Sequence, residues 1–157
     1  MINVAHIHPM LVHFPLALTP LALVVIFVAL GRDGTLVGRS GLQTSAVWLT
    51  ALAAVAAVVT AIFGDMAKDA AVGAGFSEAP IESHAGLAIV TTVLLCVLAL
   101  IHLWAYWKRS GGRLVDWVVT LGVLAACAML IGVGYLGGHL VYDLGVNVKP
   151  VIQSMGH

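Results

Sequence analysis

Residues 85–107 read AGLAIVTTVLLCVLALIHLWAYW, a run of 23 residues without a single Asp, Glu, Lys or Arg. A helix of about 20 apolar residues is long enough to cross the roughly 30 Å hydrocarbon core of a bilayer. Three more apolar runs of similar length flank it, at residues 9–30, 42–63 and 115–136. The chain is therefore predicted to cross a membrane four times.

The overall composition supports this prediction. Of 157 residues, 61% are hydrophobic and only 9% are charged, and the mean hydropathy is +1.07. Soluble domains carry about a quarter charged residues, so this chain cannot cover itself with polar surface. The formal net charge is zero, which leaves no basic surface for nucleic acid. We expect an integral membrane protein in contact with lipid and no nucleic-acid partner.

The apolar runs are continuous, which favours helices over the alternating strands of a membrane barrel. Ser77-Glu78-Ala79-Pro80 carries the signals of a helix start, and Gly145 follows a plausible helix end. We predict helices over approximately residues 9–30, 42–64, 78–107 and 115–144, in one domain without an internal sequence repeat. Short connections make successive helices antiparallel neighbours. The predicted fold is all-α: an integral membrane four-helix bundle with up-down-up-down topology.

Two details of the helices are also expected. Pro9 is placed at the first helical position, where its missing N–H costs nothing. Pro15 and Pro20 should bend and open the start of this first helix. The longest connection between two apolar runs covers residues 66–83, and the start of the third predicted helix lies within it.

The basic residues predict the orientation. Lys and Arg gather in the first and third connections, at Arg32, Arg39, Lys108, Arg109 and Arg113, whereas Lys68 and Lys149 lie on the other side. The positive-inside rule places the first group in the cytoplasm. Both termini are then periplasmic in a multi-pass protein of the bacterial inner membrane. Four tryptophans near the cytoplasmic helix ends fit an interfacial belt: Trp48, Trp104, Trp107 and Trp117.

The histidines carry the strongest functional signal. An imidazole at membrane depth is costly unless it is hydrated, paired or bound. Three helices each bring histidine to their periplasmic ends, which favours one shared site over separate hydration: the residues are His8, His13, His84 and His139. His102 lies at the opposite end of its helix and is interpreted as interfacial, beside Trp104. His6 and His157 lie near the termini and are expected to be solvated.

Other residues around the histidines fit a binding site. Asp65 follows Gly64 at the end of the second helix, where it is either hydrated or accepts a hydrogen bond from a ligating histidine. Tyr135 lies one turn before His139. Gly138 forms a small-residue pair with Gly134, which would let a neighbouring backbone or a flat cofactor approach closely.

Two kinds of bound group suit these residues. Helix bundles hold haem b between histidines of facing helices, and Lys68 and Lys149 could meet its propionates. We predict one haem b with one or two histidine ligands: His84 first, and either His13 or His139 opposite it. A Cu or Zn ion would need three or four ligands, which the four histidines could also supply. No C-x-x-C-H motif is present, so covalent haem attachment is not indicated.

Two end motifs resemble a known family. The opening His8-Pro9-Met10-Leu11-Val12-His13-Phe14-Pro15 and the closing GYLGGHLVY of residues 134–142 are similar to DUF2231, a family of small bacterial membrane proteins. The Gly64-Asp65 pair and His84 also match its pattern. The resemblance implies candidate functional positions at His8, His13, His84 and His139. Relatives occur beside redox modules such as Rieske-type iron–sulfur domains and are suspected of binding haem b, which implies electron transfer.

Two functions remain open on this basis. The first is a haem b electron-transfer protein, or a cytochrome b-type subunit of a respiratory or photosynthetic complex, with its haem near the periplasmic face. Its partners would be other membrane subunits and a periplasmic cytochrome c, an iron–sulfur protein or quinone. No acid–base pair marks a substrate pocket, so we do not expect an enzyme on its own, although a single-histidine haem with an open iron position would permit catalysis. The second is a non-redox membrane subunit or a Cu- or Zn-handling protein that uses the same histidines.

Overall fold

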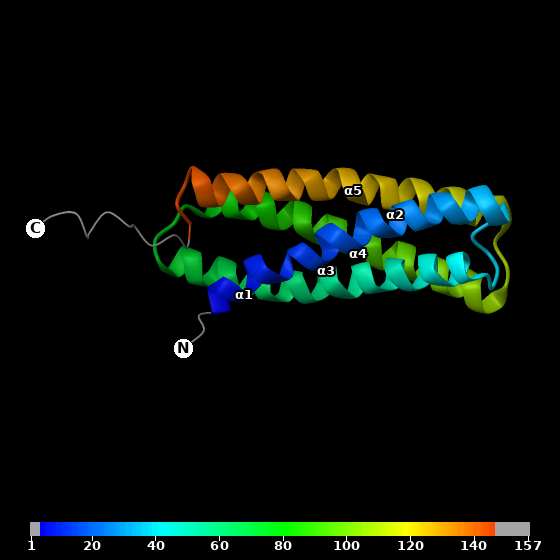
Figure 1. Cartoon of the computed structure of the whole chain (residues 1–157). Helices are drawn as coiled ribbons and strands as arrows, with labels where there is room; N and C mark the ends of the chain where they lie inside the picture. The colour runs from blue at the N-terminus through cyan, green and yellow to red at the C-terminus, as the bar shows by residue number, and fades with distance from the viewer. Residues whose placement is uncertain (1–3, 147–157) are drawn as a thin grey trace, which may run out of the picture.

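The computed structural model describes residues 4–146, with side chains from Ile7 onward. This part of the chain is helical and contains no strand (Figure 1). The helices are α1 (Val4–Leu11), α2 (His13–Asp33), α3 (Gly41–Gly73), α4 (Glu78–Lys108) and α5 (Gly112–Tyr142). Four stretches are long and apolar enough to span a membrane, namely Ile7–Asp33 and the whole of α3, α4 and α5. The predicted all-α class and the four spanning helices are confirmed. Expectations for His6, Lys149 and His157 lie outside the described side chains.

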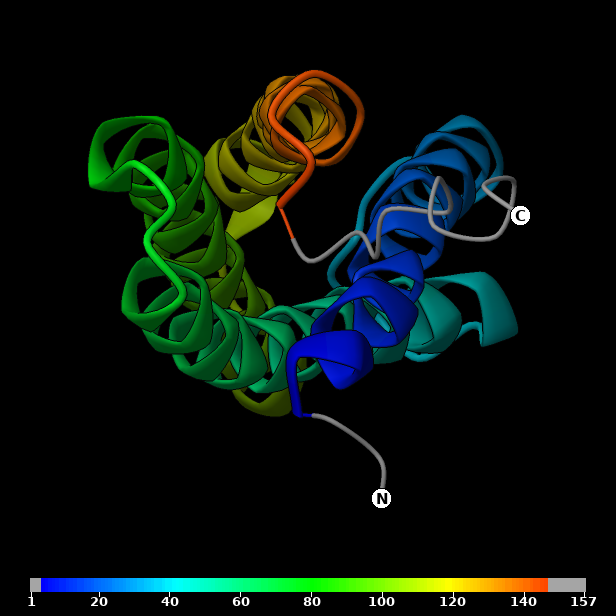
Figure 2. The ribbon, with the colours of Figure 1, turned by 90° about the vertical axis from the view of Figure 1, so that its left-hand side faces the viewer.

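The long helices alternate in direction along one axis (Figure 1). Each packs against the next in sequence, and α2 also contacts α5, which closes the bundle. Viewed along the axis, α1 lies against α3, and α5 stands apart from α1 at the near end (Figure 2). We call this near end, where α1 and α4 begin, the terminal end. The opposite end carries Arg32, Arg39, Lys108, Arg109 and Arg113, and we call it the basic end.

The predicted end of the second helix was wrong. α3 continues to Gly73, so that most of the first half of the expected connection 66–83 is helical. Ala67 and Ala71 lie one turn apart and are both buried, and Ala71 packs with Ile81 and Leu140. Alanine is the strongest helix former, and this burial extends the helix beyond its apolar run. The hydropathy of the sequence predicted only the apolar part of this helix.

The first helix also differs from its prediction. It begins at Val4, five residues before Pro9, and its interruption falls at Val12. Pro15 has no N–H to give to the carbonyl of Leu11, one turn earlier. The hydroxyl of Thr60 in α3 lies 3.2 Å from that Leu11 oxygen and 2.7 Å from the oxygen of Ala56. The interrupted segment is therefore held against α3 and is not an open helix end.

Side chains at the basic end tie the helices together. α3 starts with a capping box, in which Ser40 and Gln43 each accept a backbone N–H of the other, at 3.1 and 2.9 Å. Such reciprocal caps satisfy the free N–H groups of a helix start. The Arg39 guanidinium lies 4.0 Å from the ring centre of Tyr106 in α4. These contacts join the first connection to α3 and α4.

Small side chains fill the interior, and large apolar ones cover the outside. Ala29, Ala46 and Ala105 are fully buried, which lets neighbouring helices approach closely. By contrast, Leu100 and Ile131 are 68% and 75% exposed. An exposed apolar belt of this kind is costly in water but suits contact with lipid tails.

Candidate cofactor site

Two histidines from different helices meet at the terminal end of the bundle. His8 of α1 and His84 of α4 are neighbours, with ring centres 6.3 Å apart and ring planes nearly perpendicular, at 88°. Both side chains are half-buried. Because α1 packs on α3 and α3 packs on α4, the middle helix brings the two rings together.

Each ring is held by a hydrogen bond to a backbone carbonyl of another helix, α3 for His8 and α5 for His84. His8 Nδ1 donates to the Thr60 oxygen at 3.0 Å, and His84 Nδ1 donates to the Val133 oxygen at 3.1 Å. A carbonyl oxygen only accepts, so this assignment places the proton of each neutral ring on Nδ1. Nε2 then carries the lone pair in both rings. A histidine held in this way is prepared to bind a metal ion through Nε2.

A glycine makes room for each ring. A Cβ at Gly64 would lie 2.9 Å from His8 Cε1, and a Cβ at Gly137 would lie 3.1 Å from His84 Cε1. Each glycine stands four residues after the carbonyl that holds the same ring, which is about one helical turn. The bundle therefore contains the same histidine, carbonyl and glycine arrangement twice, once on α3 and once on α5.

The partner of His84 differs from the sequence prediction. His13 is exposed, and its Nδ1 lies 3.3 Å from the Met10 oxygen of the preceding turn. His139 is 44% exposed and bonds Asp143 at 2.6 Å. The ring opposite His84 belongs to His8. Five residues separate His8 from His13, which is a rotation of roughly 140° around a helix, so only one of them turns toward α4.

The other predicted site residues contribute less than expected. Asp65 is exposed, and the position of hydrogen-bond acceptor proposed for it is taken by backbone carbonyls. Tyr135 is 77% exposed. A Cβ at Gly138 would meet only Tyr142, at an ordinary 3.9 Å, so the close approach expected there occurs at Gly137.

Sequence reasoning missed Thr60, Val133 and Gly137 as parts of the site. Thr60 and Val133 act through backbone oxygens, which any residue type supplies. The only signal was the position of the glycines: Gly64 and Gly137 each directly follow an apolar run, at residues 42–63 and 115–136.

His102 was interpreted wrongly. Its side chain is fully buried, and neither ring nitrogen has a hydrogen-bond partner among the described residues. Leu98 and Ala105 of the same helix face are also buried. The neighbouring Trp104 led to the prediction that His102 lies at the membrane interface. The helix instead turns His102 inward and leaves Trp104 52% exposed.

An apolar cleft of about 370 Å³ lies between α2 and α5. Its lining includes Pro20 and Gly134, and Gly134 directly follows Val133. Across the described part of the chain, no group of three or more His, Cys, Asp or Glu side chains comes together to hold a metal ion. Among the side chains from Ile7 to Val146, the structure thus offers two neighbouring imidazoles and no third His, Cys, Asp or Glu beside them.

The fold and site define a four-helix membrane protein with paired imidazoles near one end. The chain belongs to the family described as predicted membrane protein DUF2231, whose model matches residues 5–150. This confirms the resemblance seen in its two end motifs. Neither the curated proteins nor the solved structures contain a match to the chain.

Proposed function

We propose that the protein binds one haem b at the terminal end of the bundle, with His8 and His84 as axial ligands, and that it transfers electrons. The observation that carries this proposal is the facing pair of imidazoles, each with Nδ1 bonded to a carbonyl. Sequence alone favoured His84 and left its partner open between His13 and His139. The geometry favours His8.

The spacing of the rings fits two ligands on one ion. Imidazole nitrogens bind metal ions at about 2 Å, which separates the two ring centres by roughly 6 Å. The ring centres of His8 and His84 are 6.3 Å apart. Haem iron needs only one or two protein ligands, whereas Zn and Cu sites built from side chains need three or four. No third His, Cys, Asp or Glu side chain joins the pair within residues 7–146, which favours haem over the metal-handling alternative.

The surroundings also suit a flat apolar group. Gly64 and Gly137 relieve crowding at the two rings, and a Cβ at Gly134 or Gly86 would touch nothing within 4 Å. Lys68 already pairs with Glu82 at 3.1 Å, which makes it a weaker candidate for a propionate partner.

When bound, haem b supplies one-electron oxidation and reduction; the chain supplies ligation, orientation and a low-dielectric setting. Thr60 and Val133 hold the imidazole planes and raise the basicity of Nε2 through their hydrogen bonds. The positive-inside rule puts the terminal end outside the cytoplasm. The partners we propose there are a soluble cytochrome c, an iron–sulfur protein or quinone, with other membrane subunits in a larger redox complex. In this role the protein is an electron carrier and not an enzyme by itself.

The absorption spectrum of the protein purified from haem-replete cells tests the proposal. We expect a Soret band, with sharp α and β bands after reduction by dithionite. His8→Gly and His84→Gly should each lose the six-coordinate spectrum, and added imidazole should restore it by filling the vacated position. His13→Gly and His139→Gly serve as matched controls and should keep the spectrum.

Two results would overturn the assignment. A colourless protein that carries stoichiometric Cu or Zn would replace haem by a metal-handling function. A six-coordinate spectrum that survives His8→Gly but not His13→Gly or His139→Gly would return the second ligand to the residues favoured by sequence.

A further inference from the structure

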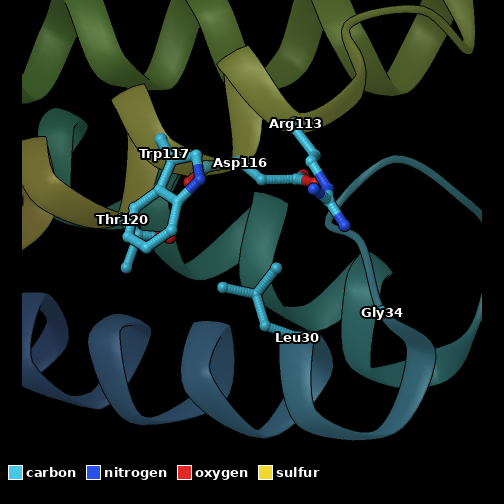
Figure 3. A pocket seen from close by; sticks show the side chains of 6 residues that line it. All are labelled: Leu30, Gly34, Arg113, Asp116, Trp117 and Thr120. Atoms are coloured by element: carbon cyan, nitrogen blue, oxygen red, sulfur yellow. The ribbon is translucent and has the colours of Figure 1, made fainter.

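A second cleft, of about 420 Å³, lies between α2 and α5 at the basic end, far from the histidine pair along the bundle axis. Figure 3 shows its lining: Leu30 and Gly34 on one side, and one face of α5 on the other, with Arg113, Asp116, Trp117 and Thr120. This face combines a cation, an anion and an aromatic ring within about two turns of helix.

The two charged side chains at this cleft do not pair with each other. Arg113 and Asp116 are three residues apart on α5, yet they form no ion pair within the described chain. Asp116 is 7% exposed. Its Oδ1 accepts the Leu36 N–H at 2.8 Å and the Thr35 hydroxyl at 3.2 Å, while Oδ2 has no hydrogen bond among the described residues. Oδ2 is not among the fully buried polar atoms that lack a partner, so it is open to a hydrogen bond from a ligand in the cleft.

We propose that this cleft binds the headgroup of a zwitterionic phospholipid that carries a primary amine. Its phosphate pairs with Arg113, and its ammonium group donates to Asp116 Oδ2. The charge pattern favours this headgroup over an anionic one. A headgroup without an ammonium would leave the Asp116 carboxylate unpaired beside another negative charge. The free N–H groups at the start of α5 add attraction for the phosphate.

The position of the cleft along the helices agrees with a lipid ligand. Trp117 is 61% exposed, as an aromatic residue at the headgroup level should be. Leu30 and the apolar outer surface of α5 continue from the cleft toward the middle of the bundle. An acyl chain attached to a headgroup at Arg113 would run along this surface within its own leaflet, which is about half of the 30 Å core.

Binding of defined lipids tests the proposal. Delipidated protein in detergent is titrated with phosphatidylethanolamine, phosphatidylcholine or phosphatidylglycerol of identical acyl chains, and bound lipid is counted by native mass spectrometry. We expect phosphatidylethanolamine to bind about tenfold more tightly than phosphatidylglycerol, because a charge-assisted hydrogen bond is gained and a repulsion is avoided. Phosphatidylcholine should bind more weakly as well, because its quaternary ammonium has no proton to donate.

Three variants make the test specific to the cleft. Asp116→Asn keeps an oxygen for the Leu36 N–H but loses the charge, so it should remove the preference for the amine headgroup. Arg113→Gln should weaken all three lipids. Lys108→Gln, an exposed charge at the same end that does not line the cleft, should bind like the unchanged protein.

The proposal is overturned if the three lipids bind equally, or if Arg113→Gln and Asp116→Asn both match Lys108→Gln. It is also overturned if a short-chain quinone displaces bound phosphatidylethanolamine at equal concentration. Circular dichroism of the variants confirms that each comparison is made on a folded bundle.

Discussion

A neutral imidazole has one N–H and one lone pair to satisfy, and the half-buried His8 and His84 differ in this respect from the fully buried His102. His8 and His84 each give the N–H to a backbone carbonyl and keep the lone pair for a ligand. His102 satisfies neither nitrogen within the described chain. A buried polar group without a partner costs about 1–3 kcal/mol, so His102 lowers the stability of the bundle.

Replacing His102 by leucine is therefore expected to stabilise the protein. Leucine has a similar volume and no polar atom, so the free energy of unfolding should rise by about 1 kcal/mol. Denaturant unfolding of the detergent-solubilised protein, followed by circular dichroism, measures the change. His13→Leu is the control, because an exposed substitution should shift stability by less than about 0.5 kcal/mol. A less stable His102→Leu variant would show that the buried imidazole makes a favourable interaction.

At the scale of elements, Thr60 of α3 joins two parts of the molecule. Its hydroxyl reaches the Leu11 oxygen that Pro15 leaves without a donor, and its backbone oxygen holds His8. The prolines in sequence predicted an interrupted helix. The acceptor of the His8 N–H depended on α1 packing against α3, which no local pattern encodes.

Thr60→Val removes the hydroxyl and keeps both the backbone oxygen and the shape of the side chain. We expect a loss of about 1 kcal/mol and faster amide hydrogen exchange in α1, because the Leu11 oxygen loses the hydroxyl proton that it shares with the Ala56 oxygen. Thr92→Val is a matched control, since the Thr92 hydroxyl bonds only the Ala88 oxygen of its own helix. Hydrogen exchange read by mass spectrometry distinguishes the two. Equal exchange in α1 for both variants would contradict the role of Thr60.

At the scale of the whole molecule, charge is distributed unevenly along the bundle axis. Five of the seven Lys and Arg residues lie within or beside the connection between α2 and α3 and the one between α4 and α5, and the exposed tryptophans lie at that same end. The terminal end instead carries Asp65, Asp69, Glu78 and Glu82 with Lys68. This asymmetry predicts a single orientation in the membrane.

Labelling of single cysteines tests the predicted orientation. With Cys96 and Cys127 replaced by alanine, Asp69→Cys should react with a membrane-impermeant maleimide in intact spheroplasts. Arg109→Cys should react only after lysis, because the positive-inside rule keeps the basic end in the cytoplasm. The reverse pattern would place the histidine pair on the cytoplasmic side.

The sequence by itself determined the class, the number of spanning helices and the family. Continuous apolar runs and short connections leave few alternatives when the solvent is a bilayer, since every backbone polar group must be satisfied within a helix or a closed barrel. The sequence also predicted that the candidate histidines lie at one end of the bundle, because the alternating directions of the helices determine at which end each residue lies.

Only the tertiary structure decided which histidines meet. The partner of His84, the inward turn of His102, and the carbonyls of Thr60 and Val133 depend on how each helix is rotated against its neighbours. A helix that is apolar on all sides has no amphipathic pattern from which this rotation can be predicted. Close contacts between side chains of different helices set it, such as the fit of each imidazole against Gly64 or Gly137.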